Sequence, residues 1–429
     1  MSILLFEDEF VPQLYPVSLA RPAFAITCGG YRLIDLFVES NETLFARVRS
    51  HLQSFVPHDF APFIQTEDGN VGQHWWLNAR LVPSVSVVRE VKKIIAAGKP
   101  AAVISGGSVA LAYLPTDKID QGFARGENKS ASKSSRVPSQ TDLLAWVERE
   151  QLPLVKADLP LFDWPHDVLR QHLLIVADNL LHRIERGDYS EIASGVFAAE
   201  GAMLAELVVT DTRRGPIILD EFSSVGPYTF LRGPVYIGAN AKVIEHAALK
   251  DGVVLGHTSK AGGEIEASIL EPYSNKQHFG FLGHSHVGSW VNLGAGTTNS
   301  DLKNSYGPIT MDYNGRKVAT EMQFIGCFIG DYAKAAIHTG IFTGKVIGAC
   351  SNLYGFVSSN VPSFVNYARS MNLLTEVPVE VAAKSQERMF ARRKVEQRPI
   401  DAQLLHDLYD LTRDERAPFE PLSKEPIAL

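Results

Sequence analysis

The residue best suited to acid–base chemistry in this chain is His278, which lies in a segment rich in glycine and polar residues. An imidazole titrates near neutral pH, so it can take a proton from an amine and later return it to a leaving thiolate. Turns built on Gly294 and Gly296 can present backbone N–H groups to the charge that develops on a thioester oxygen. The expected chemistry is therefore acyl transfer, for which no metal is required.

A repeat of six residues must position these side chains. Aliphatic residues recur at every sixth position between Leu219 and Leu255, and glycine follows three of them. A period of six fits neither an α-helix nor an exposed strand, but it is typical of a prism of short parallel strands. We therefore predict a β-helix over residues 210–360. Its predicted inward positions are Leu219, Val225, Leu231, Ile237, Val243, Leu249, Leu255, Phe281, Val287, Leu293, Ile329, Ala335, Ile341 and Ile347.

The predicted β-helix has a consequence for assembly. Each coil of a β-helix buries only a thin core, so such domains commonly associate through their flat faces and place active sites between subunits. Trp290 and Tyr306 near such a face predict a stable trimer.

Residues 375–429 are predicted to form a helical tail, with a charged helix over residues 379–397, a break at Pro399 and a second helix whose apolar face must dock.

Residues 274–299 resemble the acetyltransferase core of the GlmU family, which comprises bifunctional N-acetylglucosamine-1-phosphate uridyltransferases and glucosamine-1-phosphate acetyltransferases. That family has a lysine and a histidine before Leu-Gly, then Ile-Gly, then Asn-Ile-Gly-Ala-Gly-Thr. This chain has Lys-Gln-His, Phe-Leu-Gly, His-Val-Gly and Asn-Leu-Gly-Ala-Gly-Thr-Thr-Asn. The resemblance implies a left-handed parallel β-helix, a homotrimer, and acetyl transfer from acetyl-CoA to an amino-sugar phosphate in UDP-N-acetylglucosamine biosynthesis.

The resemblance also implies roles for individual residues. His278 is the predicted catalytic base, and Gly294, Ala295 and Gly296 are predicted to bind the cofactor. Asn299 is expected to hold the sugar or orient its amine, and Lys276 or Lys303 to contact a sugar phosphate. Phe281 also belongs to the predicted substrate site, where the family has a tyrosine. The missing hydroxyl removes one substrate hydrogen bond, so either the acceptor sugar differs or the site is impaired.

Residues 1–205 alternate strand-like and helical patterns, which predicts an α/β domain with a parallel sheet. Residues 3–6 and 101–104 are predicted strands, and residues 85–97 are a predicted helix. Residues 173–177 form another apolar run, predicted to be a strand that ends at Asp178. Residues 125–140 contain almost nothing that can be buried, so we predict a mobile insertion within this domain.

The start of this domain resembles sugar-1-phosphate nucleotidyltransferases at residues 14–22 and 30–35. The resemblance implies uridylyl or thymidylyl transfer with UTP or dTTP and Mg²⁺. Arg21 and Arg32 become candidates for substrate binding, with structural salt bridges as the alternative. Asp178 becomes a candidate magnesium ligand, with helix capping as the alternative. Where those enzymes carry a glycine-rich loop, this chain has Glu7-Asp-Glu9, an anionic segment that should repel a triphosphate. By this departure the chain resembles a divergent GlmU-like subgroup.

Two other classes of function remain open from the sequence. His278, His284 and His286 lie close in sequence and could approach one edge of the prism, as in the γ-class carbonic anhydrases, which bind zinc between subunits. The second class is a non-catalytic sugar-nucleotide-binding or scaffold protein. The Asn-Leu-Gly-Ala-Gly-Thr-Thr-Asn motif favours acyl transfer over both.

Composition narrows the partners and the compartment. The net charge of −7 argues against nucleic-acid or anionic-membrane partners, so small molecules are expected. Cys28, Cys327 and Cys350 are too few and too scattered for a disulfide framework or a zinc knuckle. The N-terminal segment has acidic residues where a signal peptide needs basic ones. We therefore predict a cytoplasmic protein with reduced thiols.

Overall fold

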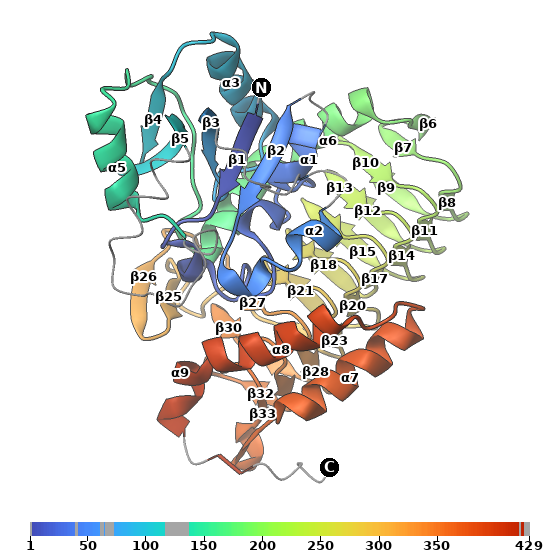
Figure 1. Cartoon of the computed structure of the whole chain (residues 1–429). Helices are drawn as coiled ribbons and strands as arrows, with labels where there is room; N and C mark the ends of the chain where they lie inside the picture. The colour runs from blue at the N-terminus through green and yellow to red at the C-terminus, as the bar shows by residue number, and fades with distance from the viewer. Residues whose placement is uncertain are drawn as a thin grey trace. The chain divides into compact units, whose positions relative to one another are not determined.

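The computed structural model describes residues 2–38, 42–60, 64, 73–115, 137–419 and 422–423. The chain forms two compact units, Met1–Val168 and Leu169–Leu429, shown in Figure 1. The domain boundary predicted between residues 205 and 210 remains a prediction. Of the predicted mobile insertion, residues 125–136 lie outside the described residues.

The first unit is built on a five-stranded sheet in the order β2-β1-β3-β5-β4. Its strands are β1 (Ser2–Phe6), β2 (Thr43–Arg47), β3 (Gln73–Asn78), β4 (Ala102–Ser105) and β5 (Ser108–Pro115). Its helices are α1 (Leu33–Val38), α2 (Val56–Asp59), α3 (Val85–Ala96) and α5 (Gln140–Arg149), with short 3₁₀ turns η1 (Val11–Leu14), η2 (Ala23–Ala25) and η3 (Ser50–Leu52). An α/β domain is therefore confirmed, as are the strands predicted at residues 3–6 and 101–104 and the helix at 85–97.

The prediction of an all-parallel sheet is wrong for one strand, β5. β1 pairs in parallel with β2 and β3, but β5 runs antiparallel to both β3 and β4. The cause is a hairpin at Ser105-Gly-Gly-Ser108, where Gly106 and Gly107 have φ values of 57° and 82°. A Gly-Gly pair between two apolar runs favours a two-residue hairpin turn, and this signal was missed in the sequence.

The strand predicted at residues 173–177 is also wrong, because these residues lie inside α6 (Pro165–Arg186). His172, Val176 and Leu180 are buried at helical spacing, while Leu174 is 71% exposed. A short apolar run cannot distinguish a strand from a buried helical segment, and here the three- and four-residue spacing decides. Asp178 is exposed on this helix, so it does not lie at the edge of a sheet.

The second unit is a left-handed parallel β-helix, which confirms the predicted fold class. Face A contains β6 (Ser190–Ala193), β7 (Val196–Ala198), β10 (Ile217–Leu219), β13 (Val235–Ile237), β16 (Val253–Leu255), β19 (Ile269–Leu270), β22 (His286–Val287), β27 (Cys327–Ile329) and β30 (Lys345–Ile347). Face B contains β8 (Met203–Leu204), β11 (Ser224–Val225), β14 (Lys242–Val243), β17 (Lys260–Ala261), β20 (Asn275–Lys276), β23 (Asn292–Leu293), β28 (Lys334–Ala335), β31 (Asn352–Leu353), β33 (Val365–Ala368) and β34 (Leu373–Glu376). Face C contains β9 (Val209–Asp211), β12 (Phe230–Arg232), β15 (Ala248–Lys250), β18 (Glu264–Glu266) and β21 (Phe281–Gly283), and a shorter sheet of β24 (Thr298–Asn299), β29 (Gly340–Ile341) and β32 (Phe356–Val357).

The predicted inward positions are confirmed except at Phe281. The other thirteen side chains in that set are at most 6% exposed, whereas Phe281 is half-buried and Leu282 points inward, in register with Ile265. The register shifts because the coils become shorter here. Leu255 pairs with Leu270, 15 residues on, and Leu270 with Val287, 17 residues on, where earlier coils advance by 18.

Further elements cover the β-helix. Val176 and Leu180 of α6 pack on the outer side of face A against Ile218, Tyr236 and Val254. A hairpin of β25 (Thr310–Tyr313) and β26 (Arg316–Ala319) interrupts the coil between β24 and β27. The C-terminal segment forms η5 (Arg369–Met371), α7 (Val379–Arg392), α8 (Pro399–Leu411), α9 (Arg413–Arg416) and η6 (Ala417–Phe419), which confirms the predicted helical tail.

Trp290, which was expected near an exposed face, is in contact with a helix of the C-terminal tail. Its ring stacks on Tyr273, with centroids 4.1 Å apart, and contacts Phe390 of α7 at 4.4 Å. Trp290 therefore packs within its own chain, and its use as an argument for a trimer is wrong. Tyr306 is 69% exposed. No helix in the described part of the chain is long and apolar enough to cross a membrane.

The packing of α6 on face A predicts how truncated chains behave. A fragment that begins at Pro165 keeps this helix, whereas one that begins at residue 210 exposes Ile218, Tyr236 and Val254. We expect the shorter fragment to lose about 3–6 kcal/mol of free energy of unfolding, from re-exposed apolar surface. Urea denaturation followed by circular dichroism measures the difference. Equal midpoints and slopes for the two fragments would contradict it.

Candidate functional site

His278 lies at the corner where the chain turns from face B to face C, between β20 and β21. Its side chain is exposed, and the neighbouring Phe279 is 61% exposed. Two coils later in the stack, the exposed His338 lies against the same corner, with its ring 5.8 Å from that of Phe279. A Cβ added to Gly296 would lie 2.6 Å from Nδ1 of His338, so glycine is required there. We call residues 278–279, 294–296 and 338 the B/C corner.

The glycine turn offers fewer N–H groups than predicted. The N–H of Gly294 donates to the carbonyl of Ala335 at 2.9 Å, and that of Gly296 donates to the carbonyl of Phe279 at 3.0 Å. Both groups are therefore used between coils, and the prediction that they are available to a substrate is wrong. Among the described residues no acceptor pairs with the N–H of Ala295, whose carbonyl accepts from the N–H of His338 at 2.7 Å.

Lys276 occupies an inward position, in register with Ala261, and is 1% exposed. Its ammonium donates to the carbonyl of Gly262 at 3.1 Å and to the carbonyl of His278 at 2.5 Å. Burial lowers the pKa of this ammonium to about 8. Lys276 therefore holds the backbone of the B/C corner from inside, and a direct contact with a sugar phosphate does not fit this position.

Asn299 also points inward and is 5% exposed. Its amide oxygen accepts from the N–H of Gly283 at 2.9 Å, and its amide nitrogen donates to the carbonyl of Gly283 at 3.0 Å. Thr298 accepts from the N–H of Phe281 through its hydroxyl at 3.0 Å. These side chains link β21 to β24, which belong to separate sheets of face C. Asn299 therefore stabilises the coil, and its predicted contact with a sugar does not fit this geometry.

The two remaining residues predicted for the site in the β-helix, Lys303 and Phe281, are not part of the B/C corner. Lys303 is half-buried, and its ammonium donates to the carbonyl of Pro308 at 2.6 Å, within the segment that follows β24. Phe281 starts β21 and is half-buried on face C.

The histidines proposed as zinc ligands do not converge. His284 lies at the corner between faces C and A, where its Nδ1 is 2.9 Å from Asp301 and its ring stacks on Phe324. His286 is fully buried on the outer side of face A, with Nε2 3.4 Å from a carboxylate oxygen of Glu271. His278 lies at the B/C corner. The three histidines thus occupy three different places of the coil, so the premise that they approach one edge of the prism is wrong.

In the first unit, the acidic segment after β1 is buried and paired. Glu7 accepts from the backbone N–H of Arg49 at 2.7 Å and from its Nε at 2.9 Å. Asp8 accepts from Nε of Arg80 at 2.9 Å and from the side-chain amide of Gln140 at 2.7 Å. Both carboxylates are 0% exposed. The prediction that they repel a triphosphate is therefore wrong, because each charge is neutralised by an arginine that the sequence analysis did not single out.

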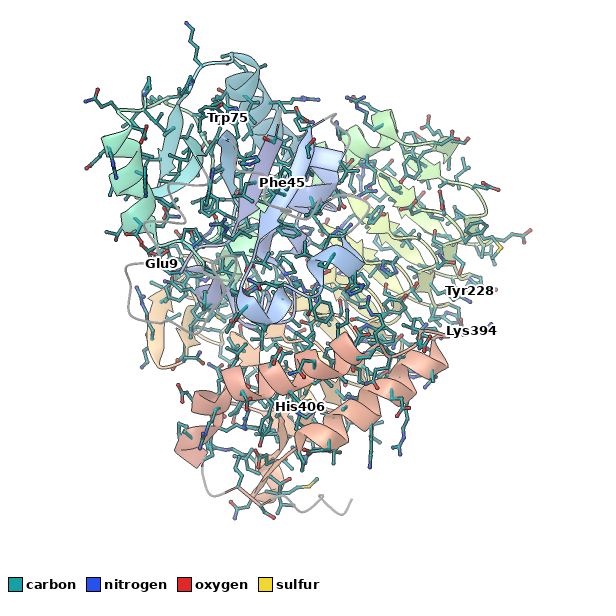
Figure 2. All side chains as sticks on the ribbon, in the orientation of Figure 1. Glu9, Phe45, Trp75, Tyr228, Lys394 and His406 are labelled. Atoms are coloured by element: carbon teal, nitrogen blue, oxygen red, sulfur yellow. The ribbon has the colours of Figure 1, made fainter. Side chains whose placement is uncertain are left out.

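The predicted residues of this unit are placed as follows. Arg32 forms a bidentate pair with Asp35, three residues on, with the closest atoms 2.6 Å apart. This pair matches the structural alternative for Arg32. Arg21 is half-buried, and its carbonyl accepts from the guanidinium of Arg49 at 2.8 Å. Glu9, labelled in Figure 2, accepts from the backbone N–H of Gln140, the first residue of α5, at 2.8 Å.

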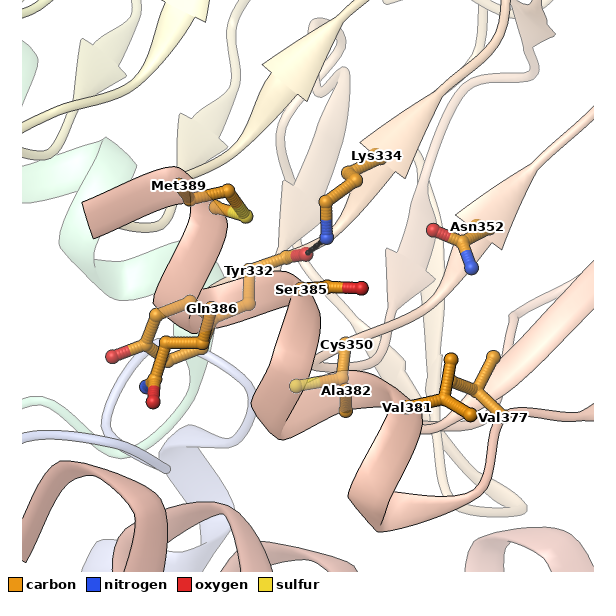
Figure 3. Close-up of a pocket in the computed structure, with 10 residues that line it drawn as sticks. All are labelled: Tyr332, Lys334, Cys350, Asn352, Val377, Val381, Ala382, Ser385, Gln386 and Met389. Atoms are coloured by element: carbon orange, nitrogen blue, oxygen red, sulfur yellow. Dashed lines mark hydrogen bonds between the residues drawn. The ribbon is translucent and has the colours of Figure 1, made fainter. Parts of the chain in front are cut away.

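A separate cavity of about 60 Å³ lies between face B and α7. Figure 3 shows its lining, which is Tyr332, Lys334, Cys350, Asn352, Val377, Val381, Ala382, Ser385, Gln386 and Met389. The ammonium of Lys334 donates to the carbonyl of Tyr332 at 3.0 Å. No residue predicted for the site from the sequence lines this cavity, so it is distinct from the B/C corner.

Comparison with known proteins finds similarity over parts of the chain. Residues 3–180 match the family described as sugar nucleotidyl transferase. A bifunctional sugar-1-phosphate nucleotidylyltransferase/acetyltransferase of Sulfurisphaera tokodaii is 27% identical over 143 residues, 33% of this chain and 36% of that protein. The bifunctional protein GlmU of Thermotoga petrophila is 25% identical over 236 residues, 52% of this chain and 45% of that protein.

Over part of its length, the chain is similar to GlmU proteins. A GlmU of Methanococcus vannielii is 30% identical over 116 residues, 27% of this chain and 27% of that protein. The chain thus spans less than half the length of these relatives. Among solved structures, the UDP-N-acetylglucosamine acyltransferase of Francisella novicida covers 51% of this chain and 78% of its own, with 13% identity and a TM-score of 0.26. The acetyltransferase domain of PglB from Neisseria gonorrhoeae, in complex with acetyl coenzyme A, has 13% identity and a TM-score of 0.19 over 62% of this chain and 92% of its own.

Burial of Lys276 predicts a pH-dependent stability. Its pKa is about 8 in the fold and ordinarily 10.5. Between these values the unfolded chain binds more protons than the folded one, so the free energy of unfolding rises as the pH is raised through this window. We expect Lys276→Met to remove about 1–3 kcal/mol of that rise. Urea unfolding of wild type and variant at several pH values measures it, with Lys303→Met as the matched control. Parallel curves for wild type and Lys276→Met would contradict it.

Proposed function

We propose that this protein transfers an acetyl group from acetyl-CoA to the amine of an amino-sugar phosphate at the B/C corner. The observation that carries the proposal is an exposed His278 beside the glycine turn of Asn-Leu-Gly-Ala-Gly-Thr. The similarity to a bifunctional sugar-1-phosphate nucleotidylyltransferase/acetyltransferase supports the same reaction. A cytoplasmic location is part of the proposal.

The residues of the corner supply the steps. The imidazole of His278 takes a proton from the sugar ammonium, and the freed amine attacks the thioester carbon. The N–H of Ala295 donates to the oxygen that becomes negative in the tetrahedral intermediate. The intermediate collapses with cleavage of the carbon–sulfur bond, and the imidazolium returns its proton to the thiolate. The second proton of the attacking amine is released to solvent, which leaves a neutral amide. Lys276 fixes the carbonyl of His278 and so positions the base.

Nucleotidyl transfer in the first unit is a second candidate, supported by the match of residues 3–180 to the sugar nucleotidyl transferase family. UTP or dTTP would be the nucleotide substrate. The described residues do not fit a magnesium site, because Glu7 and Asp8 are buried in arginine pairs and Asp178 lies on an exposed helical surface. We therefore derive no step through Mg²⁺.

The sharpest test is kinetic. We expect His278→Ala to lower kcat with acetyl-CoA and glucosamine 1-phosphate by about 10²- to 10⁴-fold, the usual contribution of a positioned base. His257→Ala is the matched control, because His257 is an exposed histidine at another corner of the β-helix. His338→Ala tests whether the second histidine of the B/C corner shares the role. Wild-type turnover by His278→Ala would overturn the assignment, and binding without turnover by wild type would favour a sensing or scaffold protein.

Assembly as a homotrimer is part of the proposal, since β-helix acyltransfer sites are expected between subunits. We expect sedimentation equilibrium at micromolar concentration to give three times the chain mass of 47.1 kDa. Several large apolar side chains on and beside face C are exposed, including Phe279, Phe342 and Phe356. Phe356→Glu should weaken association if face C is buried. A monomer mass for the wild type would contradict the trimer.

A further inference from the structure

Four cations gather on the outer side of face B, where α7 ends. Lys242 of β14 and Lys260 of β17 are register partners on neighbouring parallel strands. Lys260 is in turn the register partner of Asn275 on β20. The guanidinium of Arg393 donates to the amide oxygen of Asn275 at 2.6 Å. We call Lys242, Lys260, Arg392 and Arg393 the basic cluster. Lys394, which follows it in the chain, is labelled in Figure 2.

The members of the cluster repel one another. The pKa of Lys260 is lowered by burial and then by the charges of Arg393, Lys242 and Arg392. The pKa of Arg393 is lowered by burial and then by the charge of Arg392. Within the described ranges, no carboxylate lies in salt-bridge distance of any of the four, so their charges are not neutralised by the chain itself.

Ordinary structural roles explain only part of this arrangement. A basic residue in the last turn of a helix interacts favourably with the helix dipole, which accounts for Arg392. Like charges directly opposite on neighbouring strands are destabilising, and this applies to Lys242 and Lys260. The chain has 48 acidic residues against 41 lysines and arginines, so acidic partners are abundant elsewhere. An unpaired cluster in such a chain points to an anion from outside it.

We propose that the basic cluster binds a ligand with two or more linked phosphate groups. Two lysines on neighbouring strands, whose backbones are usually about 4.8 Å apart, and two arginines at the end of α7 supply more positive charge than a single phosphate neutralises. The amide nitrogen of Asn275 is left as a donor, because its oxygen accepts from Arg393. Asn292, the exposed register partner of Asn275, adds a second amide to the same row. The ligand is either free diphosphate or the diphosphate of a nucleotide.

The basic cluster shares no residue with the B/C corner. Lys242, Lys260 and Asn275 lie on strands of face B. The two proposals are tested separately, because titration with diphosphates reports on the basic cluster and the turnover of His278→Ala reports on the corner.

Isothermal titration of the full chain with pyrophosphate, ADP and orthophosphate tests the proposal, at low and at raised salt. We expect saturable binding of pyrophosphate or ADP that weakens with salt, and clearly weaker binding of orthophosphate. Tighter binding of ADP than of pyrophosphate would identify a nucleotide as the ligand, and equal binding would identify the diphosphate group itself. The double variant Lys242→Gln, Lys260→Gln should raise the Kd at least about tenfold, because it removes two charged hydrogen-bond donors to the phosphates.

Two controls keep the result interpretable. Lys384→Gln removes an exposed lysine of the same helix α7 and should leave the Kd unchanged. The double variant should melt at the same temperature as the wild type or higher, because it relieves repulsion, so lost binding is not lost folding. The proposal is overturned if the wild type shows no saturable binding of pyrophosphate or ADP, if orthophosphate binds as tightly, or if the double variant binds like the wild type.

Discussion

The parallel stacking of coils in one fixed register is the interaction on which the second unit depends. Each strand pairs with the strand one coil away, so every inward position becomes part of a continuous column of side chains. On face C this column contains Leu231, Leu249, Ile265 and Leu282, all at most 1% exposed. A residue that enters a column must fill the axis or find hydrogen-bond partners there, because the interior offers no water.

Two polar residues that meet that condition are Lys276, at the B/C corner, and Asn299, beside Gly283 at the end of β21. Lys276 stands in the column of face B and sends its ammonium to backbone carbonyls at the corner. Asn299 stands in the column of face C and bonds both polar groups of Gly283. Each replaces an aliphatic residue and thereby costs apolar burial. Lys276 fixes the main chain at His278, and Asn299 fixes it at Gly283, two residues after Phe281. Both polar residues of the core therefore lie in the segment that carries the motif.

The first unit follows a different principle. Its carboxylates at the end of β1 are buried, and they are stable there only because Arg49 and Arg80 supply charge and hydrogen bonds together. Arg80 also donates to the carbonyl of Phe162 at 2.8 Å, which ties the end of β3 to the segment before α6. The family match covers this unit, yet the place of a phosphate-binding glycine loop is taken by an internal ion-pair network. Sequence similarity and the chemistry of the residues at this site therefore point in different directions.

The sequence by itself determined the β-helix, because each six-residue side of the three-sided prism needs one inward aliphatic residue. This requirement appears directly in the sequence as a period of six. It also determined the helices at 85–97 and in the tail, and the segment around His278. Only the tertiary structure decided the one-residue shift from Phe281 to Leu282, since it arises from shortened coils whose lengths no local pattern records. Only it decided that Lys276 and Asn299 point inward and that Glu7 and Asp8 meet arginines more than 40 residues away. It also decided that Lys260 lies beside Lys242 and close to Arg393. Periodicity along the chain reports which side of an element is buried, whereas contacts between distant segments depend on how coils and helices are brought together in space.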